Sequence, residues 1–159
     1  MGAAGTGAAR PLSVEFIVDR ARRWLVGWNA HDVEGLVSMC TEAVVWDDPA
    51  LPDTVYGHDG VRGFLRAIFK TFPDLRIEGT DGIFLTMGPR ALVPYRLTGT
   101  MRGDWEPRGL TATGRTVDYR GIDDWEFGDG RLCRYNTHYD SLEAARQLGL
   151  LSQLARREA

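Results

Sequence analysis

Apolar residues recur with a helical period in three stretches of the N-terminal half of the chain. The first stretch follows Ser13, a residue type that often caps a helix, and its apolar spacing of three to four residues predicts a helix up to Trp28. A short second helix is predicted to start at Asp32, and a third, capped by Asp59, is predicted to end at Phe72. The predicted buried faces of the two long helices consist of Phe16, Ile17, Ala21, Trp24, Leu25 and Trp28, and of Val61, Phe64, Leu65, Ile68, Phe69 and Phe72.

The rest of the chain mostly shows the alternation of apolar and polar residues that is typical of strands. One strand, at residues 43–46, precedes the third helix, and the later strands are predicted at residues 75–78, 83–86, 91–101, 116–127 and 131–139. A tight turn at Gly128-Asp129-Gly130 joins the last two strands, and Ser141 is expected to cap a final helix. Segregated helices and antiparallel strands predict a single α+β domain at residues 13–159, preceded by a disordered tail at residues 1–12.

The strand at residues 116–127 carries an unusual carboxylate. Alternate residues of a strand point to opposite faces, so Asp123 lies between Gly121 and Trp125 on the face that is otherwise apolar. The opposite face, which includes Asp124, is expected to be solvated. A carboxylate on a buried face must be paired, neutral or functional. Asp123 is therefore either a structural residue that binds an arginine or a tyrosine hydroxyl, or a general acid or base.

The returning strand contributes further polar residues to the same region. The residues Cys133, Tyr135, Thr137 and Tyr139 are predicted to share one face. If Asp123 faces a cavity, Tyr135 and Thr137 are expected to line it, and Tyr135 can donate a hydrogen bond to the carboxylate. Each of these residues can equally be a core residue whose hydroxyl binds the backbone.

Composition narrows the partner to a small molecule or another protein. The 159 residues carry a formal net charge of −3, whereas nucleic-acid binders usually show a basic balance, and no apolar stretch is long enough to span a membrane. The two cysteines, Cys40 and Cys133, predict buried thiols in a reducing compartment, so a cytoplasmic location is expected. The three histidines show no metal-binding spacing, so neither a metal nor another cofactor is predicted.

An ordered series of short motifs resembles the SnoaL-like polyketide cyclases, within the nuclear transport factor 2-like superfamily. The resemblance covers about residues 13–151. Its motifs are Trp28-Asn29-Ala30-His31-Asp32, Trp46-Asp47-Asp48-Pro49, Tyr56-Gly57-His58-Asp59-Gly60-Val61, Phe72-Pro73-Asp74-Leu75, Thr98-Gly99-Thr100, Thr113-Gly114-Arg115, Asp129-Gly130-Arg131-Leu132 and Gln147-Leu148-Gly149-Leu150. The resemblance implies a cone-shaped α+β barrel, in which three N-terminal helices pack on a curved, mostly antiparallel sheet around an apolar cavity.

The resemblance also implies positions for the chemistry. In the cyclases and the related limonene-epoxide hydrolase, an acid–base aspartate lies on the last strand, at the position that Thr137 occupies here. Threonine cannot act as a general base at neutral pH. A second polar position of the cyclase cavity falls on Asp123, so the acid–base carboxylate has either moved across the hairpin or been lost.

The residues and the resemblance predict two alternative functions. The first is a cofactor-independent enzyme that acts on an apolar polyketide-like, terpenoid-like or steroid-like molecule, as a cyclase (intramolecular aldol) or as a related isomerase or hydrolase. Asp123 is its predicted catalytic residue, Asp48 is the next candidate, and the predicted substrate-binding residues are Trp46, Asp48, Trp125, Tyr135 and Thr137. The second function is non-catalytic binding of a small molecule, which would be favoured if Arg96 or another guanidinium neutralised Asp123. In either case a homodimer or higher oligomer is expected through the exposed sheet face of Arg134, Asn136 and His138.

Overall fold

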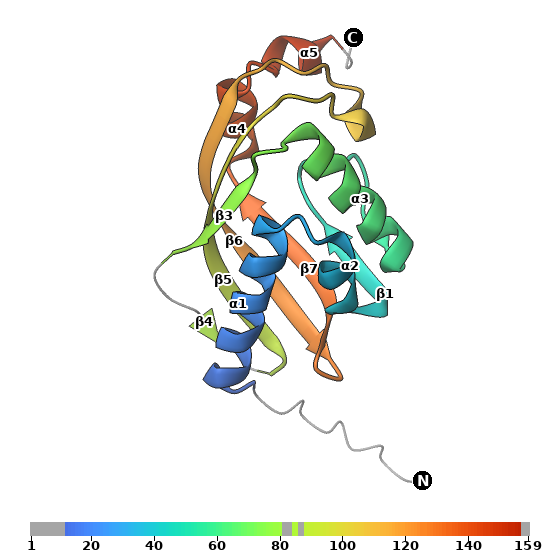
Figure 1. Cartoon of the computed structure of the whole chain (residues 1–159), viewed down its shortest axis with the longest axis vertical. Coiled ribbons are helices and arrows are strands. Elements are labelled where there is room, and N and C mark those ends of the chain that lie inside the picture. The colour runs from blue at the N-terminus through green and yellow to red at the C-terminus, as the bar shows by residue number, and fades with distance from the viewer. Residues whose placement is uncertain (1–11, 81–83, 86–87, 157–159) are drawn as a thin grey trace, which may run out of the picture.

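The computed structural model describes residues 12–80, 84–85 and 88–156. The tail predicted at residues 1–12 lies, except for Leu12, outside these described residues. Three N-terminal helices are present, α1 (Val14–Asn29), α2 (Val33–Ser38) and α3 (Gly57–Thr71), and α1 and α3 lie on the same face of the sheet (Figure 1). The predicted caps of the first two helices are confirmed, because the side chains of Ser13 and Asp32 accept hydrogen bonds from backbone N–H groups of the first turn.

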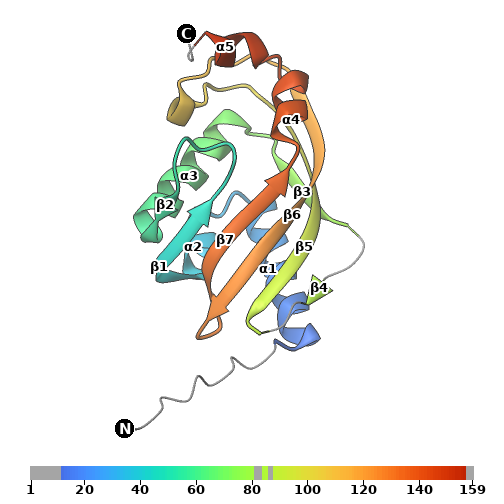
Figure 2. The same cartoon turned by 180° about the vertical axis from the view of Figure 1, so that it is seen from behind.

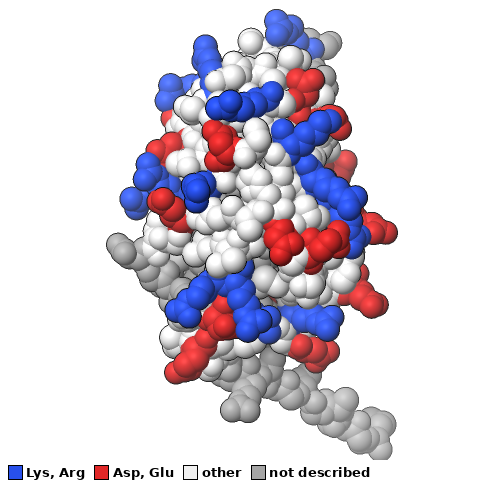
Figure 3. All heavy atoms as spheres, in the orientation of Figure 1, with Lys and Arg blue, Asp and Glu red and all other residues white. Residues whose placement is uncertain are grey.

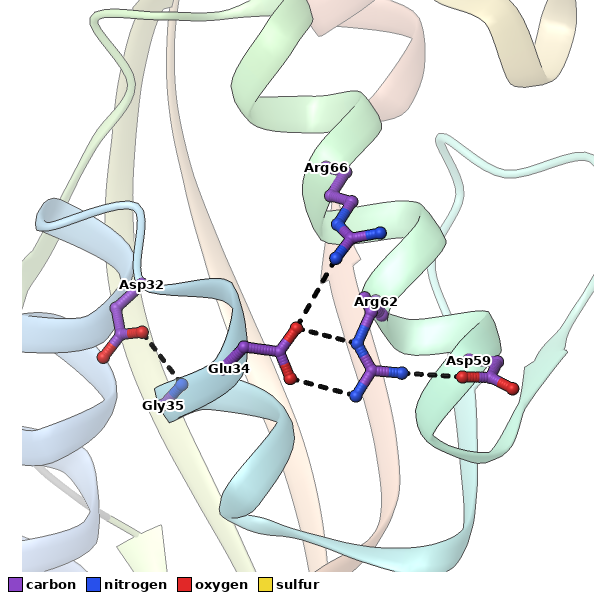
Figure 4. A network of polar contacts seen from close by, with 6 residues as sticks. All are labelled: Asp32, Glu34, Gly35, Asp59, Arg62 and Arg66. Atoms are coloured by element: carbon purple, nitrogen blue, oxygen red, sulfur yellow. Dashed lines mark hydrogen bonds and ion pairs between the residues drawn. The ribbon is translucent and has the colours of Figure 1, made fainter.

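The predicted cap of the third helix is wrong. The N-cap position of α3 is Tyr56, and Asp59 lies inside the first turn, where it binds Arg62 at 2.6 Å. Arg62 also binds both carboxylate oxygens of Glu34 on α2, and Arg66 approaches one of them (Figure 4). The motif that suggested a cap therefore belongs to an exposed ion-pair network that joins α2 to α3.

The strands form one curved, open sheet. The bounds of the strands are β1 (Cys40–Asp47), β2 (Val55–Tyr56), β3 (Arg76–Gly79), β4 (Phe84–Leu85), β5 (Arg90–Thr100), β6 (Thr116–Gly128) and β7 (Arg131–Tyr139). Their order is β2-β1-β7-β6-β5-β3, and β4 pairs separately with β5. All pairs are antiparallel except β1 with β7, and no pairing between β2 and β3 closes a barrel among the described residues. The α+β fold is confirmed, with an open sheet in place of a closed barrel.

The face assignment of the last hairpin needs one correction. A bulge shifts the register of β6 and β7, so that Glu126 pairs with Arg134 but Phe127 pairs with Leu132. The extra residue is Cys133, and Leu132 takes its expected place in the core. Cys133 is consequently only partly buried, whereas Cys40 is buried as predicted.

The C-terminal part of the chain lies at one end of the molecule (Figures 1 and 2). The predicted last helix is divided into α4 (Ser141–Gln147) and α5 (Leu151–Ala155), because Gly149 adopts a positive φ of 70° between them. Asp140, rather than Ser141, caps α4. The loop predicted at residues 103–114 contains a short 3-10 helix, η1 (Glu106–Arg108), and lies beside α5 at this end (Figures 1 and 2).

Aromatic side chains fill the core between the helices and the sheet. Trp24 of α1 contacts Trp46, Trp125 and Tyr135, which come from three adjacent strands, and Trp46 stacks on Tyr135 with ring centroids 3.9 Å apart. Among the described elements, no helix covers the opposite face of β5, β6 and β7 (Figure 2). The solvated face predicted for β6 is correct except for Asp124, which is buried because it forms an ion pair with Arg90.

The surface shows no segregation of charge on the face drawn in Figure 3, where basic and acidic side chains are interspersed. Within the part of the chain that the structure describes, no helix is long and apolar enough to cross a membrane.

Candidate functional site

A cavity of about 380 Å³ lies where α4 and α5 pack near one end of the sheet. Its walls come from α3, β5, β6, β7, α4, α5 and the loops at residues 49–50 and 103–114. Most of its lining is aliphatic or aromatic, which suits an apolar ligand. The lining residues with a polar side-chain group are Trp105, Arg108, Tyr119, Tyr139 and Ser141.

Two stacked tyrosines lie between the cavity and the half-buried carboxylate of Asp48. The rings of Tyr119 on β6 and Tyr139 on β7 lie 4.5 Å apart, and both line the cavity. The hydroxyl of Tyr139 donates a hydrogen bond to Asp48 at 3.1 Å, and the backbone N–H of Ala50 donates another at 2.8 Å. Burial raises the pKa of Asp48 to about 6, although these two donors and the charge of Arg108 lower it. Asp48 therefore changes its charge close to neutral pH.

An arginine from the loop over the cavity lies at the same corner. The guanidinium of Arg108 donates to the backbone carbonyls of Pro49, Ala50 and Leu51, and it lines the cavity. The indole N–H of Trp105 donates to the carbonyl of Ala50 as well, at 2.8 Å. These bonds hold the 103–114 loop against the segment that follows β1. Tyr139, Asp48 and Arg108 together make one polar corner in an otherwise mostly apolar cavity.

The predicted catalytic residue, Asp123, is deeply buried. It has an exposed fraction of 4%, and Tyr135 donates a hydrogen bond to its carboxylate at 2.8 Å. Burial is the main cause that raises the pKa of Asp123 to about 7, and the charge of Asp48 raises it further, whereas the hydroxyls of Tyr135 and Thr137 lower it. No guanidinium pairs with Asp123 among the described residues, since Arg96 binds Asp118 on the outer face.

A tyrosine that the sequence analysis did not single out completes this network. Tyr95 on β5 shares a hydrogen bond of 2.7 Å with the hydroxyl of Thr137. Burial raises the pKa of Tyr95, and the charge of Asp123 acts in the same direction, so the hydroxyl stays neutral. Tyr95 shares a strand face with the buried Val93 and Leu97, and this period of two was the signal that could have placed it on the inner face.

The six predicted site residues lie close to one another, but none of them belongs to the described lining of the cavity. Trp46, Trp125 and Tyr135 belong to the aromatic core, and Asp123 and Thr137 lie beside them. Among the described residues that line the cavity, none of these five occurs, and Asp48 reaches the cavity only through Tyr139. The sequence analysis placed Tyr139 on the correct face but gave no role to Tyr139 or Tyr119. It also missed Arg108, because the loop around Arg108 has no periodicity to read.

The described part of the chain contains no cluster of three or more histidine, cysteine, aspartate or glutamate side chains that could hold a metal ion.

Comparison with known proteins gives a family match and related folds. Residues 21–135 match the model of the SnoaL-like domain. No curated protein sequence matches the chain. Its structure is similar to that of TsrD from Streptomyces laurentii, with a TM-score of 0.74 and 24% identity over 88% of this chain and 99% of that one.

Two further solved structures share the fold. One is a "putative SnoaL-like polyketide cyclase" from Jannaschia sp. CCS1, with a TM-score of 0.72 and 18% identity over 88% of this chain and 97% of that one. The other is an NTF2-like protein of unknown function from Burkholderia pseudomallei K96243, with a TM-score of 0.69 and 21% identity over 86% of this chain and 98% of that one. At these identities the likeness establishes the fold.

Proposed function

The chain belongs to the SnoaL-like domain family, and from that premise we propose that it is an enzyme that moves a proton on an apolar small molecule by acid–base chemistry of its own side chains. A cyclase that closes a ring by an intramolecular aldol step, or a related isomerase or hydrolase, fits this description. The observation that carries the proposal is the polar corner of the cavity, where Tyr139 lines the wall and donates to a carboxylate that lacks an ion-pair partner among the described residues.

Because Asp123 lies outside the described lining of the cavity, we assign the role of proton acceptor to Asp48 instead. The hydroxyl of Tyr139 already donates to Asp48, so its lone pairs are available to accept a proton from a ligand in the cavity. Burial raises the pKa of Tyr139, which disfavours a free tyrosinate. The transfer is therefore coupled: the ligand C–H bond breaks, Tyr139 takes that proton, and the proton of Tyr139 passes to Asp48. The electron pair stays on the ligand as an enolate, which then attacks or is reprotonated.

A simple proton-transfer probe tests this proposal. 5-Nitrobenzisoxazole is apolar and small, and removal of its ring C–H proton breaks the N–O bond and releases a coloured phenolate. We expect a saturable rate that rises as pH increases through about 6, because Asp48 must be ionised to accept the proton. The variants Asp48→Asn and Tyr139→Phe should each lower the rate by roughly 10²–10⁴-fold, which is the usual contribution of a positioned acid–base group.

Asp123→Asn is the matched comparison, because it removes the other buried carboxylate of the same region. We expect the rate of this variant to stay within a few-fold of the wild-type rate. If Asp123→Asn abolishes the rate and Asp48→Asn does not, the proton acceptor is Asp123, as the sequence alone predicts.

Non-catalytic binding is the second candidate function. One reason is Thr137, which occupies the position where the SnoaL-like cyclases that this chain resembles carry an aspartate. A second reason is that neither Asp48 nor Asp123 belongs to the described lining of the cavity. Binding of a neutral apolar fluorophore in the cavity, with a probe-turnover rate that neither Asp48→Asn nor Asp123→Asn changes, would support this function over the enzyme.

A further inference from the structure

Arg108 has a geometry that its role in holding the loop does not fully explain. Its Nε donates to Ala50 at 2.9 Å and its Nη2 donates to the carbonyls of Pro49 and Leu51, so the guanidinium is fixed in one place. In the described part of the chain no carboxylate lies within ion-pair distance of it, although eight other arginine or lysine side chains have such a partner. The side chain nevertheless lines a cavity whose wall is otherwise mostly apolar. A fixed cation that forms no direct ion pair is an environment in which a negative charge can be stabilised.

The charge of Arg108 acts on the two residues of the proposed proton transfer. It lowers the pKa of Asp48 and that of Tyr139, which places the guanidinium within electrostatic reach of both. When a proton passes from the ligand to Asp48, the negative charge moves from the carboxylate to the ligand oxygen. The total charge of the polar corner stays the same. Arg108 acts on the charged carboxylate of Asp48 before the transfer and can act on the new oxyanion of the ligand after it, so no additional charge is buried.

We propose that Arg108 binds and stabilises the negatively charged oxygen of the ligand, so that the cavity accepts an apolar molecule with one oxygen that carries or develops a negative charge. This inference rests on the proposed function, because it places the developing charge at the corner of Tyr139 and Asp48. It adds a substrate-binding residue and restricts the ligand class to acidic carbonyl compounds, such as those that form a stable enolate.

A matched pair of fluorophores tests the inference without knowledge of the natural ligand. 1-Anilinonaphthalene-8-sulfonate and N-phenyl-1-naphthylamine share one aromatic body, and only the first carries an anionic group. We expect Arg108→Gln to weaken binding of the sulfonate by roughly 10–100-fold, which is the range for loss of a hydrogen bond to a charged group. Binding of the neutral amine should stay within about threefold. Arg108→Lys should restore part of the preference for the anion.

The pH dependence provides a second measurement. The titratable and charged side chains that act electrostatically with Asp48 are Tyr95, Arg108, Tyr119, Asp123, Tyr135 and Tyr139. The tyrosines stay neutral, so only the two aspartates change charge between pH 5 and pH 8. We expect the sulfonate to bind more tightly at pH 5, where both carboxyl groups are protonated, and the neutral amine to bind equally at both. Asp48→Asn should remove the part of this change near pH 6, and Asp123→Asn the part near pH 7.

Two controls separate the charge of Arg108 from its contribution to the loop. Trp105→Phe removes the other hydrogen bond to Ala50 but leaves the charge, so the preference for the anion should remain. Arg102→Gln removes an exposed arginine outside the cavity lining and should change neither affinity. The inference is overturned if Arg108→Gln weakens both fluorophores equally or neither. If no fluorophore binds the wild-type protein, the proposed function fails with it.

Discussion

At the scale of single residues, the site depends on two carboxylates whose burial is tolerated because hydroxyl groups face them. Tyr135 donates to Asp123 and Tyr139 donates to Asp48, and neither carboxylate binds a guanidinium in the described part of the chain. Both pKa values are raised by burial. An arginine in the same place would fix the carboxylates in the ionised form and abolish their capacity to exchange protons near neutral pH.

Raised pKa values make the stability of the protein depend on pH. The folded protein holds the proton of Asp123 up to pH of about 7, whereas the unfolded chain releases it near pH 4, so the folded state is favoured at low pH. We expect the free energy of unfolding to fall by a few kcal/mol as pH rises from about 4.5 to 7.5. Asp123→Asn should make this change smaller and leave the part that Asp48 contributes, as measured by urea denaturation at several pH values. A curve that is equally steep in the variant would contradict the prediction.

At the scale of elements, strand β6 has a glycine at the position where the ring of Tyr95 approaches the strand. Gly121 pairs with Tyr95 on β5 and with Tyr139 on β7, and a Cβ atom at Gly121 would lie 2.5 Å from the Tyr95 hydroxyl oxygen. That approach is too short for any side chain, so the tyrosine ring or the backbone would have to move. The glycine thus permits the ring of Tyr95 to lie over the strand and to reach Thr137.

Alanine at this position tests that relation. We expect Gly121→Ala to destabilise the protein by about 1–3 kcal/mol, the usual cost of overpacking a core. Gly63→Ala is the matched control: it lies in α3 with no atom within 4 Å of the added Cβ, and should stabilise the helix by roughly 0.5–1 kcal/mol. Thermal unfolding of the two variants should therefore shift in opposite directions. Equal shifts would show that Tyr95 is not held by the glycine.

The elements also show why the sequence predicted some features and not others. Period-two alternation placed Asp123 and Trp125 inside correctly, because both strand faces of β6 are long and regular. Alternation failed at Cys133, where a bulge inserts one residue, because a bulge leaves no mark in the pattern. The location of the cavity depends on how α4, α5 and the loop around Arg108 pack on the sheet, and these tertiary contacts have no local signal in the sequence.

At the scale of the whole molecule, helices cover only one face of the sheet. No described helix covers the outer face of β5, β6 and β7 (Figure 2). Ile122 of β6 has an exposed fraction of 40% and alternates with the buried Gly121 and Asp123, so it points to this face. We propose that this face, which includes Arg134, Asn136 and His138, is where two copies of the chain associate.

Light scattering tests this proposal. At micromolar concentration we expect the mass of a dimer or a higher oligomer, and Ile122→Glu should convert it to the 17.7 kDa monomer by placing a charge in the contact. Val26→Glu is the control, because Val26 is an exposed apolar residue of α1 with an exposed fraction of 65% on the other side of the molecule. It should leave the mass unchanged. A wild-type protein that is entirely monomeric would rule out the association.

The parallel pairing of β1 with β7 determines when the sheet can be completed during synthesis. Val45 pairs with Arg134, so β1 has emerged from the ribosome long before its partner exists. At translation rates of roughly 5–20 residues per second, that delay lasts on the order of 5–20 s. During this time Trp46 has no Tyr135 to stack against, and the aromatic faces of α1 and α3 have no complete sheet to cover. We therefore expect the nascent chain to expose apolar surface until its last strand is made, and a ribosome that stalls between the two strands to leave an aggregation-prone chain.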